Sequence, residues 1–208
     1  MSTVEHYGTL FPTAVVGSMP RPDFVREIVV DGRSEDPQRS TELMDRAVAY
    51  IVSLQEQSGL DILSDGEWRR ASYIGVIAEL AHGFELGEED GRPWTLVTDK
   101  LCEKNAGFIA AEIRYLKSIT SHRIKATLPA PALLGERMWD EKKSSGAYPT
   151  RRAFVEDCVP VLRHELELLR DEGVDVIQID DPHLCLLVDD KVRAQYQDPD
   201  SEAAFPPK

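Results

Sequence analysis

The sequence predicts an α/β fold in which parallel strands alternate with helices. Two segments are the main evidence: residues 59–67, GLDILSDGE, and residues 173–182, GVDVIQIDDP. Each runs from a glycine through an apolar stretch too short for a helix into acidic residues. Nearly continuous β-branched runs are typical of parallel strands covered on both faces, and α/β folds bind ligands beyond the carboxyl ends of their strands. We therefore expect a fully covered strand at 174–180 and acids at the ligand-binding edge of the sheet.

The first half of the chain predicts two strands, one helix and an excursion. A short strand is expected at 12–17, PTAVVG, followed by a proline-rich turn. Asp36 and Pro37 are typical of a helix start, and apolar residues at helical spacing continue this helix to Gly59. The second strand is expected at 60–64. Residues 68–100, with several glycines and acids, predict a long βα excursion that could contain a small hairpin.

The second half continues the alternation. Its predicted elements are a helix at about 103–118, a strand at 123–128, a loop containing Trp139, a helix from Thr150 through 170, a strand at 174–180 and the start of a helix after 186. Pro160 should kink or split the helix that contains it. A complete eight-stranded barrel needs about 250 residues. We therefore expect a TIM-barrel-like but incomplete fold of about four strand-helix units, forming a single partial barrel domain over 1–208.

The composition excludes several classes of function. The net charge is −13 and the basic residues form only short pairs, which argues against nucleic acid as a partner. No apolar run approaches the roughly 20 residues that span a bilayer, so we expect a cytoplasmic protein with no membrane partner. Three widely spaced cysteines argue against a disulfide framework.

Four strand-end segments have a family resemblance. They are Val15–Pro20, Ser64–Arg70, Lys125–Pro131 and Ile177–Pro182. In order and position they resemble the C-terminal catalytic domain of cobalamin-independent methionine synthase, within the uroporphyrinogen decarboxylase and methionine synthase superfamily of TIM barrels. The resemblance covers the N-terminal half of such a barrel. It implies transfer of a methyl group from a methylated folate or another donor to a thiol such as homocysteine, with zinc activating the thiol.

The resemblance also implies site residues. It assigns the turn at Val16, Gly17 and Ser18 to the amino-acid carboxylate, Glu67 and Asp180 to its ammonium, Asp181 to support of the loop, and Trp139 or Trp68 to a wall for a flat pterin. Glu67, Asp180 and Asp181 are thus the predicted catalytic acids. From residue type alone, Asp180 and Asp181 could instead cap the following helix, and Gly17 and Ser18 could form a tight turn.

The zinc ligands implied by the resemblance are absent from the sequence. In the family, a His-x-Cys pair, a glutamate and a second cysteine follow later strands, and this chain ends before them. His183 and Cys185 have the His-x-Cys spacing, but they follow the wrong strand and remain weak candidates. We therefore assign no metal ligand from the sequence.

Two alternatives stay open. A metal-free decarboxylase of the uroporphyrinogen type would need arginines that reach substrate carboxylates, for which Arg21, Arg69 and Arg70 are available. A non-catalytic half-barrel would expose sheet edges and an apolar face. Such a module would pair with a second copy of itself or with a companion half-barrel.

Overall fold

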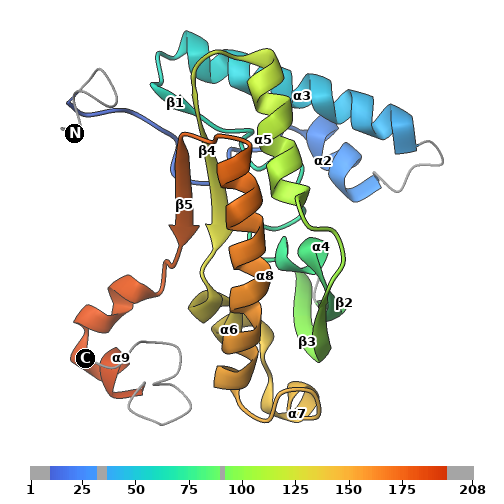
Figure 1. Ribbon diagram of the computed structural model, residues 1–208, viewed down its shortest axis with the longest axis vertical. Helices are drawn as coiled ribbons and strands as arrows, with labels where there is room; N and C mark the ends of the chain where they lie inside the picture. The colour runs from blue at the N-terminus through green and yellow to red at the C-terminus, as the bar shows by residue number, and fades with distance from the viewer. Residues whose placement is uncertain (1–9, 32–36, 90–91, 196–208) are drawn as a thin grey trace. The chain divides into compact units, whose positions relative to one another are not determined.

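The computed structural model of the chain describes residues 10–31, 37–89 and 92–195 (Figure 1). Its elements are α2 (Asp23–Asp31), α3 (Pro37–Gln57), β1 (Ile62–Leu63), α4 (Ile77–Leu80), β2 (Ala81–Glu89), β3 (Arg92–Glu103), α5 (Phe108–Ile119), β4 (Arg123–Pro129), α6 (Pro131–Met138), α7 (Glu141–Ser144), α8 (Arg151–Asp171), β5 (Val176–Asp180), η1 (Leu184–Val188) and α9 (Asp190–Gln195). The alternation of strands and helices confirms the α/β class.

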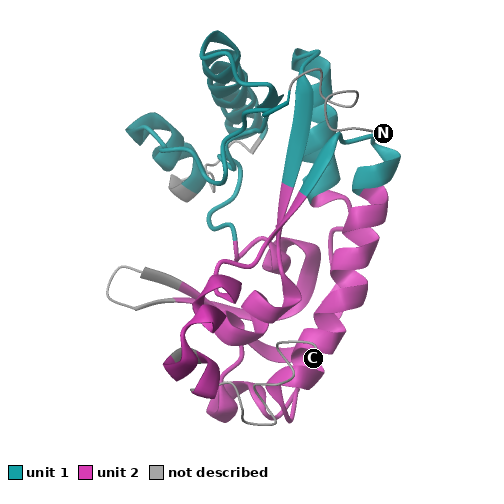
Figure 2. Cartoon of the chain, turned by 90° about the vertical axis from the view of Figure 1, so that its left-hand side faces the viewer, with its two compact units in different colours: residues 1–73, 109–126, 169–177 teal, residues 74–108, 127–168, 178–208 magenta. Residues whose placement is uncertain are grey.

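Two compact units make up the chain (Figure 2). Unit 1 contains residues 1–73, 109–126 and 169–177, and unit 2 contains residues 74–108, 127–168 and 178–208. Each unit therefore combines stretches that are far apart in sequence. The boundary passes through β4, α8 and β5.

The main sheet is open and has the strand order β1-β4-β5. β1 and β4 pair in parallel, with Ile62 opposite Arg123 and Leu63 opposite Ile124. The predicted strands at 60–64, 123–128 and 174–180 are thus confirmed with small changes at their ends. The strand predicted at 12–17 is wrong in extent, because it forms only a single parallel bridge from Ala14 to Ile62.

Gly59 and Gly173 end the helices that precede β1 and β5. Their φ angles are 74° and 70°, in the left-handed region that glycine adopts at helix ends. The next backbone N–H reaches back to the helix in the same way in both cases: Leu60 to the Gln55 carbonyl at 3.2 Å and Val174 to the Leu169 carbonyl at 3.3 Å. The predicted helix ends are therefore confirmed.

An aspartate two residues after each glycine binds the start of a neighbouring segment of the sheet. Asp61 Oδ2 accepts the backbone N–H of Thr13 at 2.7 Å. Asp175 Oδ2 accepts the backbone N–H of Ile124 at 2.9 Å. The repeated glycine–apolar–aspartate pattern thus both ends a helix and satisfies a backbone donor at the amino end of the sheet.

The core of unit 1 lies between the sheet and helices α3 and α5. Its buried apolar residues include Ala47, Val48, Ile51, Leu63, Ile113, Leu116 and Ile124. α3 begins where the sequence predicted, although its predicted N-cap, Asp36, lies outside the described residues. α2, which follows the proline-rich turn, was not predicted from the sequence.

The excursion contains the expected hairpin. β2 and β3 pair antiparallel, with a bulge between His82 and Phe84, where Gly83 has a φ of 110°. β3 continues to Glu103, so α5 begins at Phe108 and the helix start predicted near 103 is wrong. In unit 2 the hairpin packs on α8 through the edge-to-face pair Phe84–Phe154, with ring centroids 6.2 Å apart.

α8 is a single helix of 21 residues, and Thr150 caps it as predicted, accepting the Ala153 N–H at 3.2 Å. The expectation that Pro160 could split the helix is wrong. Proline removes the hydrogen bond to the carbonyl four residues earlier, which belongs to Glu156. Both residues are on an exposed part of the helix, where water can satisfy that carbonyl. Trp139 lies outside the helices as predicted, but the short helices α6 and α7 form on either side of it, which the sequence did not predict.

β5 is less buried than predicted. Its residues are half-buried or exposed, and the side chain of Ile179 is 54% exposed. The central strand β4 has the fully buried pattern instead. β5 is the edge strand of the described sheet, so its β-branched run is covered less than that of an inner strand. After it, η1 contains no buried residue. No described helix is long and apolar enough to cross a membrane.

Candidate functional site

The turn after β1 buries charged side chains at the carboxyl end of the strand. Asp65 and Glu67 are 5% and 2% exposed. Gly66 and Glu67 both have left-handed backbones, with φ of 69° and 57°, a conformation that costs free energy at a non-glycine residue. Asp65 Oδ1 holds this turn by accepting the Glu67 N–H at 2.8 Å, which fixes the direction of the Glu67 side chain.

The segment around Ser18 packs on this turn. The Met19 N–H donates to the Gly66 carbonyl at 3.0 Å, and Trp68 Nε1 donates to the Met19 carbonyl at 3.2 Å. A Cβ at position 66 would lie 3.3 Å from Met19 Cβ, so a glycine permits the close approach. Ser18 Oγ donates to Glu67 Oε2. The structure therefore brings together two predicted site residues that are 49 positions apart.

The turn before Ser18 is partly open to solvent. Val16 is 79% exposed, and a Cβ added at Gly17 would meet no atom within 4 Å. The buried ammonium of Lys125, on β4, donates to the carbonyls of Val15 and Val16, the latter at 3.1 Å. The Lys125 ammonium on β4 thus fixes the backbone of the turn before Ser18. This role of Lys125 was not predicted, although a lysine in a buried strand indicates an internal partner.

Arg21 connects the Ser18 turn to the strand-end turn. Its Nη2 donates to the Glu67 carbonyl at 2.6 Å and to the Arg70 carbonyl. Burial lowers the pKa of Arg21, while the charges of Glu67 and Asp65 oppose that shift. Among the described residues, Arg21 Nε and Asp65 Oδ2 are buried without a hydrogen-bond partner. One carboxylate oxygen of Asp65 and one guanidinium nitrogen of Arg21 are therefore left without a hydrogen bond from the described residues.

Arg70 and Glu112 form a buried ion pair beneath the same turn. Arg70 Nη2 donates to Glu112 Oε2 at 2.6 Å, and the two side chains are 3% and 4% exposed. Burial opposes the charge of Arg70, but the adjacent Glu112 outweighs it and the net pKa of Arg70 is raised. Burial also raises the pKa of Glu112 to about 7 against the attraction of Arg70. The pair anchors α5 to the site.

The arginines that a decarboxylase would need are engaged inside unit 1. Arg69 Nη2 contacts Asp45 Oδ1 at 2.5 Å, and its guanidinium lies 4.7 Å from the Tyr115 ring centroid. Arg21 and Arg70 have the internal partners described above. These contacts do not favour the decarboxylase alternative, because each of the three guanidinium groups already contacts other groups of the protein.

Asp180 and Asp181 lie in unit 2, at the end of β5. Asp180 Oδ1 accepts from Gln178 Nε2 at 2.6 Å, and its carbonyl accepts the Ala130 N–H at 2.9 Å. The carboxylate of Asp181 accepts backbone N–H groups of residues 183 and 184, and burial, followed by the nearby Glu136, raises its pKa. Asp181 therefore caps the turn that follows β5, a role that its residue type alone allowed.

His183 and Glu136 form a contact that the sequence did not predict. His183 Nδ1 pairs with Glu136 Oε2, and the two side chains are 30% and 10% exposed. Cys185 is exposed, and its Sγ lies 3.1 Å from the Pro182 carbonyl. The side chains of His183 and Cys185 thus have different partners, and no group of at least three acidic, histidine or cysteine residues in the described ranges could hold a metal ion. The described donors do not fit the zinc that the resemblance implies.

The two candidate tryptophans differ. Trp68 is 1% exposed, so its ring is part of the core and the idea that it forms a pterin wall is wrong. Trp139 is half-buried, and its Nε1 donates to the Tyr148 carbonyl at 3.0 Å. The Arg151 guanidinium lies 5.9 Å from the centroid of the Trp139 ring. Trp139 therefore remains a candidate wall.

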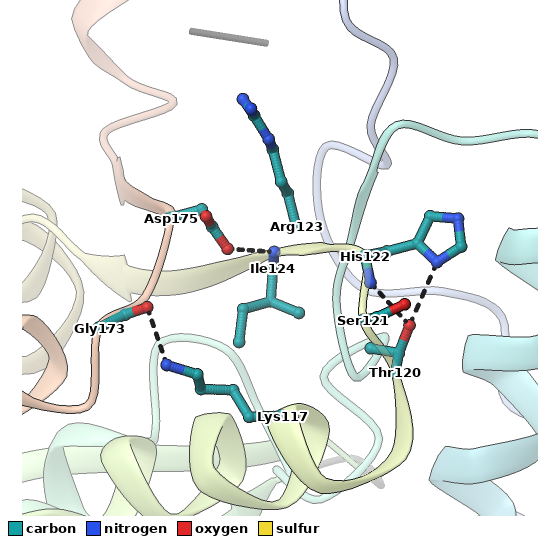
Figure 3. Close-up of a pocket in the computed structure, with 8 residues that line it drawn as sticks. All are labelled: Lys117, Thr120, Ser121, His122, Arg123, Ile124, Gly173 and Asp175. Atoms are coloured by element: carbon teal, nitrogen blue, oxygen red, sulfur yellow. Dashed lines mark hydrogen bonds between the residues drawn. The ribbon is translucent and has the colours of Figure 1, made fainter. Parts of the chain in front are cut away.

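A polar cavity of about 240 Å³ lies at the amino end of β4 in unit 1 (Figure 3). Its charged groups serve the fold. Lys117 Nζ donates to the carbonyls of Glu172 and Gly173, at 2.6 and 3.2 Å, and Asp175 binds the Ile124 N–H. The cavity is therefore at the end of the strand opposite to the carboxyl end, where α/β folds bind ligands.

Comparison with known proteins identifies the family to which the chain belongs. The family described as "Cobalamin-independent synthase, Catalytic domain" matches residues 11–204. The chain is 30% identical over 184 residues to a methionine synthase from Sulfolobus acidocaldarius, covering 84% of this chain and 52% of the relative. It is 27% identical to a 5-methyltetrahydropteroyltriglutamate–homocysteine methyltransferase from Bacillus mycoides, covering 84% of this chain and 24% of the relative.

Solved structures show the same fold. A B12-independent methionine synthase from Shewanella sp. W3-18-1, in complex with selenomethionine, has a TM-score of 0.69 at 21% identity and covers 96% of this chain and 59% of its own. A second, from Listeria monocytogenes, has a TM-score of 0.66 at 23% identity, covering 86% of this chain and 54% of its own. The chain thus spans about half the length of the archaeal relative and of these structures, and about a quarter of the bacterial relative.

Proposed function

Because the chain belongs to the family of cobalamin-independent methionine synthase catalytic domains, we propose that it binds an amino-acid thiol such as homocysteine for methyl transfer to sulfur. The observation that supports this best is the contact between Ser18 and Glu67 at the carboxyl end of β1. A hydroxyl and a buried carboxylate side by side can bind the two ends of an amino acid.

Each part of this corner suits one group of the ligand. The turn at Val16, Gly17 and Ser18 would hold the ligand carboxylate, and the Ser18 hydroxyl would turn from Glu67 to donate to it. Glu67 supplies the charge-assisted acceptor for an ammonium. Its backbone is held by Asp65, so the ligand would meet a preorganised side chain. The family resemblance adds Asp180 to the ammonium partners, which its substitution by asparagine tests separately.

The methyl donor that we propose is a methylated folate. The bacterial relatives are named for 5-methyltetrahydropteroyltriglutamate and homocysteine, and Trp139 is a half-buried aromatic side chain that could stack on a pterin. Zinc would supply activation of the thiol, but the described residues include no ligand set for it. We therefore assign no step to a metal here.

A companion half-barrel, or a second copy of this chain, is part of the proposal. In unit 2, Leu128, Leu162, Leu166 and Ile179 are among the lining of an apolar cavity of about 220 Å³. The exposed Ile179 lies on the edge strand of the described sheet, and exposed apolar surface of this kind favours association. Light scattering tests this part: a stable monomer at all concentrations would contradict it. By analogy with the family we place the protein in the cytoplasm, which cell fractionation can check.

Calorimetric titration of the 208-residue protein with homocysteine and with methionine tests the binding site. Ser18→Ala and Glu67→Gln should each weaken binding by roughly 10- to 100-fold, because a hydrogen bond to a charged group contributes about 1.5–3 kcal/mol. Ser118→Ala is the matched control, since Ser118 is an exposed serine that donates only to a local carbonyl, that of Tyr115. No binding of either amino acid to the folded chain, or unchanged affinity in both site variants, would contradict the proposal.

A further inference from the structure

The apolar cavity of unit 2 has an arginine in its lining. The cavity, of about 220 Å³, is lined from α8, from β5 and from the end of β4. Leu162, Leu166 and Ile179 contribute apolar side chains, and Arg163 lies beside them. Pockets for small-molecule ligands are usually larger, at about 300–1,000 Å³. The volume therefore suits a side chain inserted by a partner.

Arg163 indicates the charge of that partner. Its residue is exposed, and no described residue pairs with its guanidinium in a hydrogen bond or an ion pair. A guanidinium offers five donors and stays charged, so it favours a partner that brings a carboxylate. The chain is itself acidic, with a net charge of −13. A second copy of the chain can therefore supply the complementary charge.

The segment after β5 exposes the groups that the cavity needs. η1 contains no buried residue, and Leu184, Leu186 and Val188 are among the exposed large apolar residues of the chain. Val188 is 87% exposed, and Asp189 follows it directly. Apolar side chains exposed together are typical of surfaces that bind a partner. η1 thus presents an aliphatic side chain and a carboxylate at adjacent positions.

The Asp189 carboxylate is oriented and still has acceptor capacity. Its Oδ1 accepts the Lys191 N–H at 2.8 Å, which fixes the side chain at the start of α9. A carboxylate accepts hydrogen bonds on both oxygens, so Oδ2 can also accept from a guanidinium. Asp190, in contrast, already pairs with Arg193. Asp189 is therefore the acid of this turn that best fits Arg163.

We propose that two copies of the chain associate through unit 2, with Val188 of each copy in the apolar cavity of the other and Asp189 paired with Arg163. All these residues belong to unit 2 (Figure 2), so each copy provides both the cavity and the side chains that fill it. The same contact then occurs twice about a twofold axis, and association ends at a dimer. The inference rests on the association that is part of the proposed function, and it assigns the contacts.

The two contacts contribute differently to the dimer. Burying Val188 removes apolar surface from water, which stabilises the complex. The Arg163–Asp189 pair lies beside this apolar contact, where charge complementarity selects the partner and fixes the register of the two copies. Reversing either charge should therefore disrupt the dimer, and reversing both in a matched way should restore it.

Sedimentation velocity of the 208-residue protein over a range of concentrations measures the dissociation constant of the dimer. Arg163→Glu and Asp189→Arg should each raise this constant by about tenfold or more, because like charges then face each other at both contacts. An equal mixture of the two variants should dimerise again. In the mixed dimer an acid faces an arginine at both contacts, which a general loss of folding could not produce.

Three further variants separate the interface from local effects. Val188→Ser should weaken the dimer by about tenfold, because it removes most of the buried apolar surface of that side chain. Asp189→Asn keeps an acceptor for the Lys191 N–H and removes only the charge, so it should weaken the dimer less than Asp189→Arg. Lys142→Glu is the control: Lys142 is an exposed cation on α7, outside the proposed interface, and its reversal should leave the constant unchanged. Thermal melts check that every variant folds.

The outcomes distinguish this interface from the rest of the proposed function. A wild-type monomer at every concentration would contradict both the inference and the association, and leaves amino-acid binding to be judged by calorimetry. A dimer that is insensitive to the charge variants, or that the mixture fails to restore, would contradict this interface alone. A monomer that binds octanoate, and loses this binding in Arg163→Glu, would assign the cavity to a small carboxylate and overturn the inference.

Discussion

Removing one partner of the Arg70–Glu112 pair should destabilise the protein strongly. Three contacts join the two side chains, from Nε at 3.3 and 3.2 Å and from Nη2 at 2.6 Å, and both are almost fully buried. Breaking a buried ion pair from one side costs about 3–5 kcal/mol, since the remaining charge is left without a partner. For a domain of this size, that corresponds to a fall in Tm of roughly 6–20 °C.

The two single variants should differ in their dependence on pH. In Arg70→Met, the buried Glu112 can escape its unpaired charge by taking a proton, so its folded pKa lies above the unfolded value. Below about pH 7, Glu112 holds a proton in both folded proteins, so their stabilities should change with pH in parallel. Above about pH 7 the wild type stops losing stability while Arg70→Met continues to lose it, so the gap between them should widen. In Glu112→Gln, Arg70 stays charged throughout this range and no carboxyl titrates at this position. The cost relative to wild type should therefore fall as the pH rises toward about 7 and be nearly constant above it.

Urea unfolding followed by circular dichroism at pH 5, 6.5 and 8 measures both effects as differences from the wild type. The wild type is the reference because burial already raises the pKa of Glu112 to about 7. Arg152→Met, which breaks the exposed Arg152–Glu156 pair, is the control and should cost less than about 1 kcal/mol. A cost below about 1 kcal/mol for both site variants, or an Arg70→Met cost that ignores pH, would refute the reasoning.

Three more predictions follow from single contacts. Hydrogen bonds from Thr13 lower the pKa of Asp61. The contribution of Asp61 to folding stability should therefore be present above about pH 4 and be lost as the pH falls below that. Asp61→Asn should be less stable than wild type at pH 7, and the difference in stability should close at acid pH in urea melts. Tyr148→Phe should cost about 1–3 kcal/mol, measured by thermal melts, because the buried hydroxyl donates to a carboxylate and accepts a backbone N–H. Gly66→Ala should lower stability by about 1–2 kcal/mol and weaken homocysteine binding, because φ is 69° and Met19 is close; Gly146→Ala, with open space around it, should do neither.

Local patterns predicted much of the fold because helix and strand formation depends on neighbouring residues. Short apolar stretches located β1, β4 and β5, and the glycines at 59 and 173 located the ends of two helices. Failures occurred where the result depends on distant contacts. The short helices α6 and α7 form beside Trp139 without having been predicted, and Pro160 stays within an unbroken helix.

The candidate site shows the same division. The sequence alone, through residue types at strand ends and a family resemblance, selected Ser18, Glu67 and Asp180. Only the tertiary structure decided that Ser18 donates to Glu67 from 49 positions away, and that the neighbouring arginines have internal partners. It also decided that His183 pairs with Glu136. Strand periodicity and turn chemistry act between adjacent residues and can be recognised in the chain, whereas which side chains meet, and which remain exposed, depends on how separate elements pack.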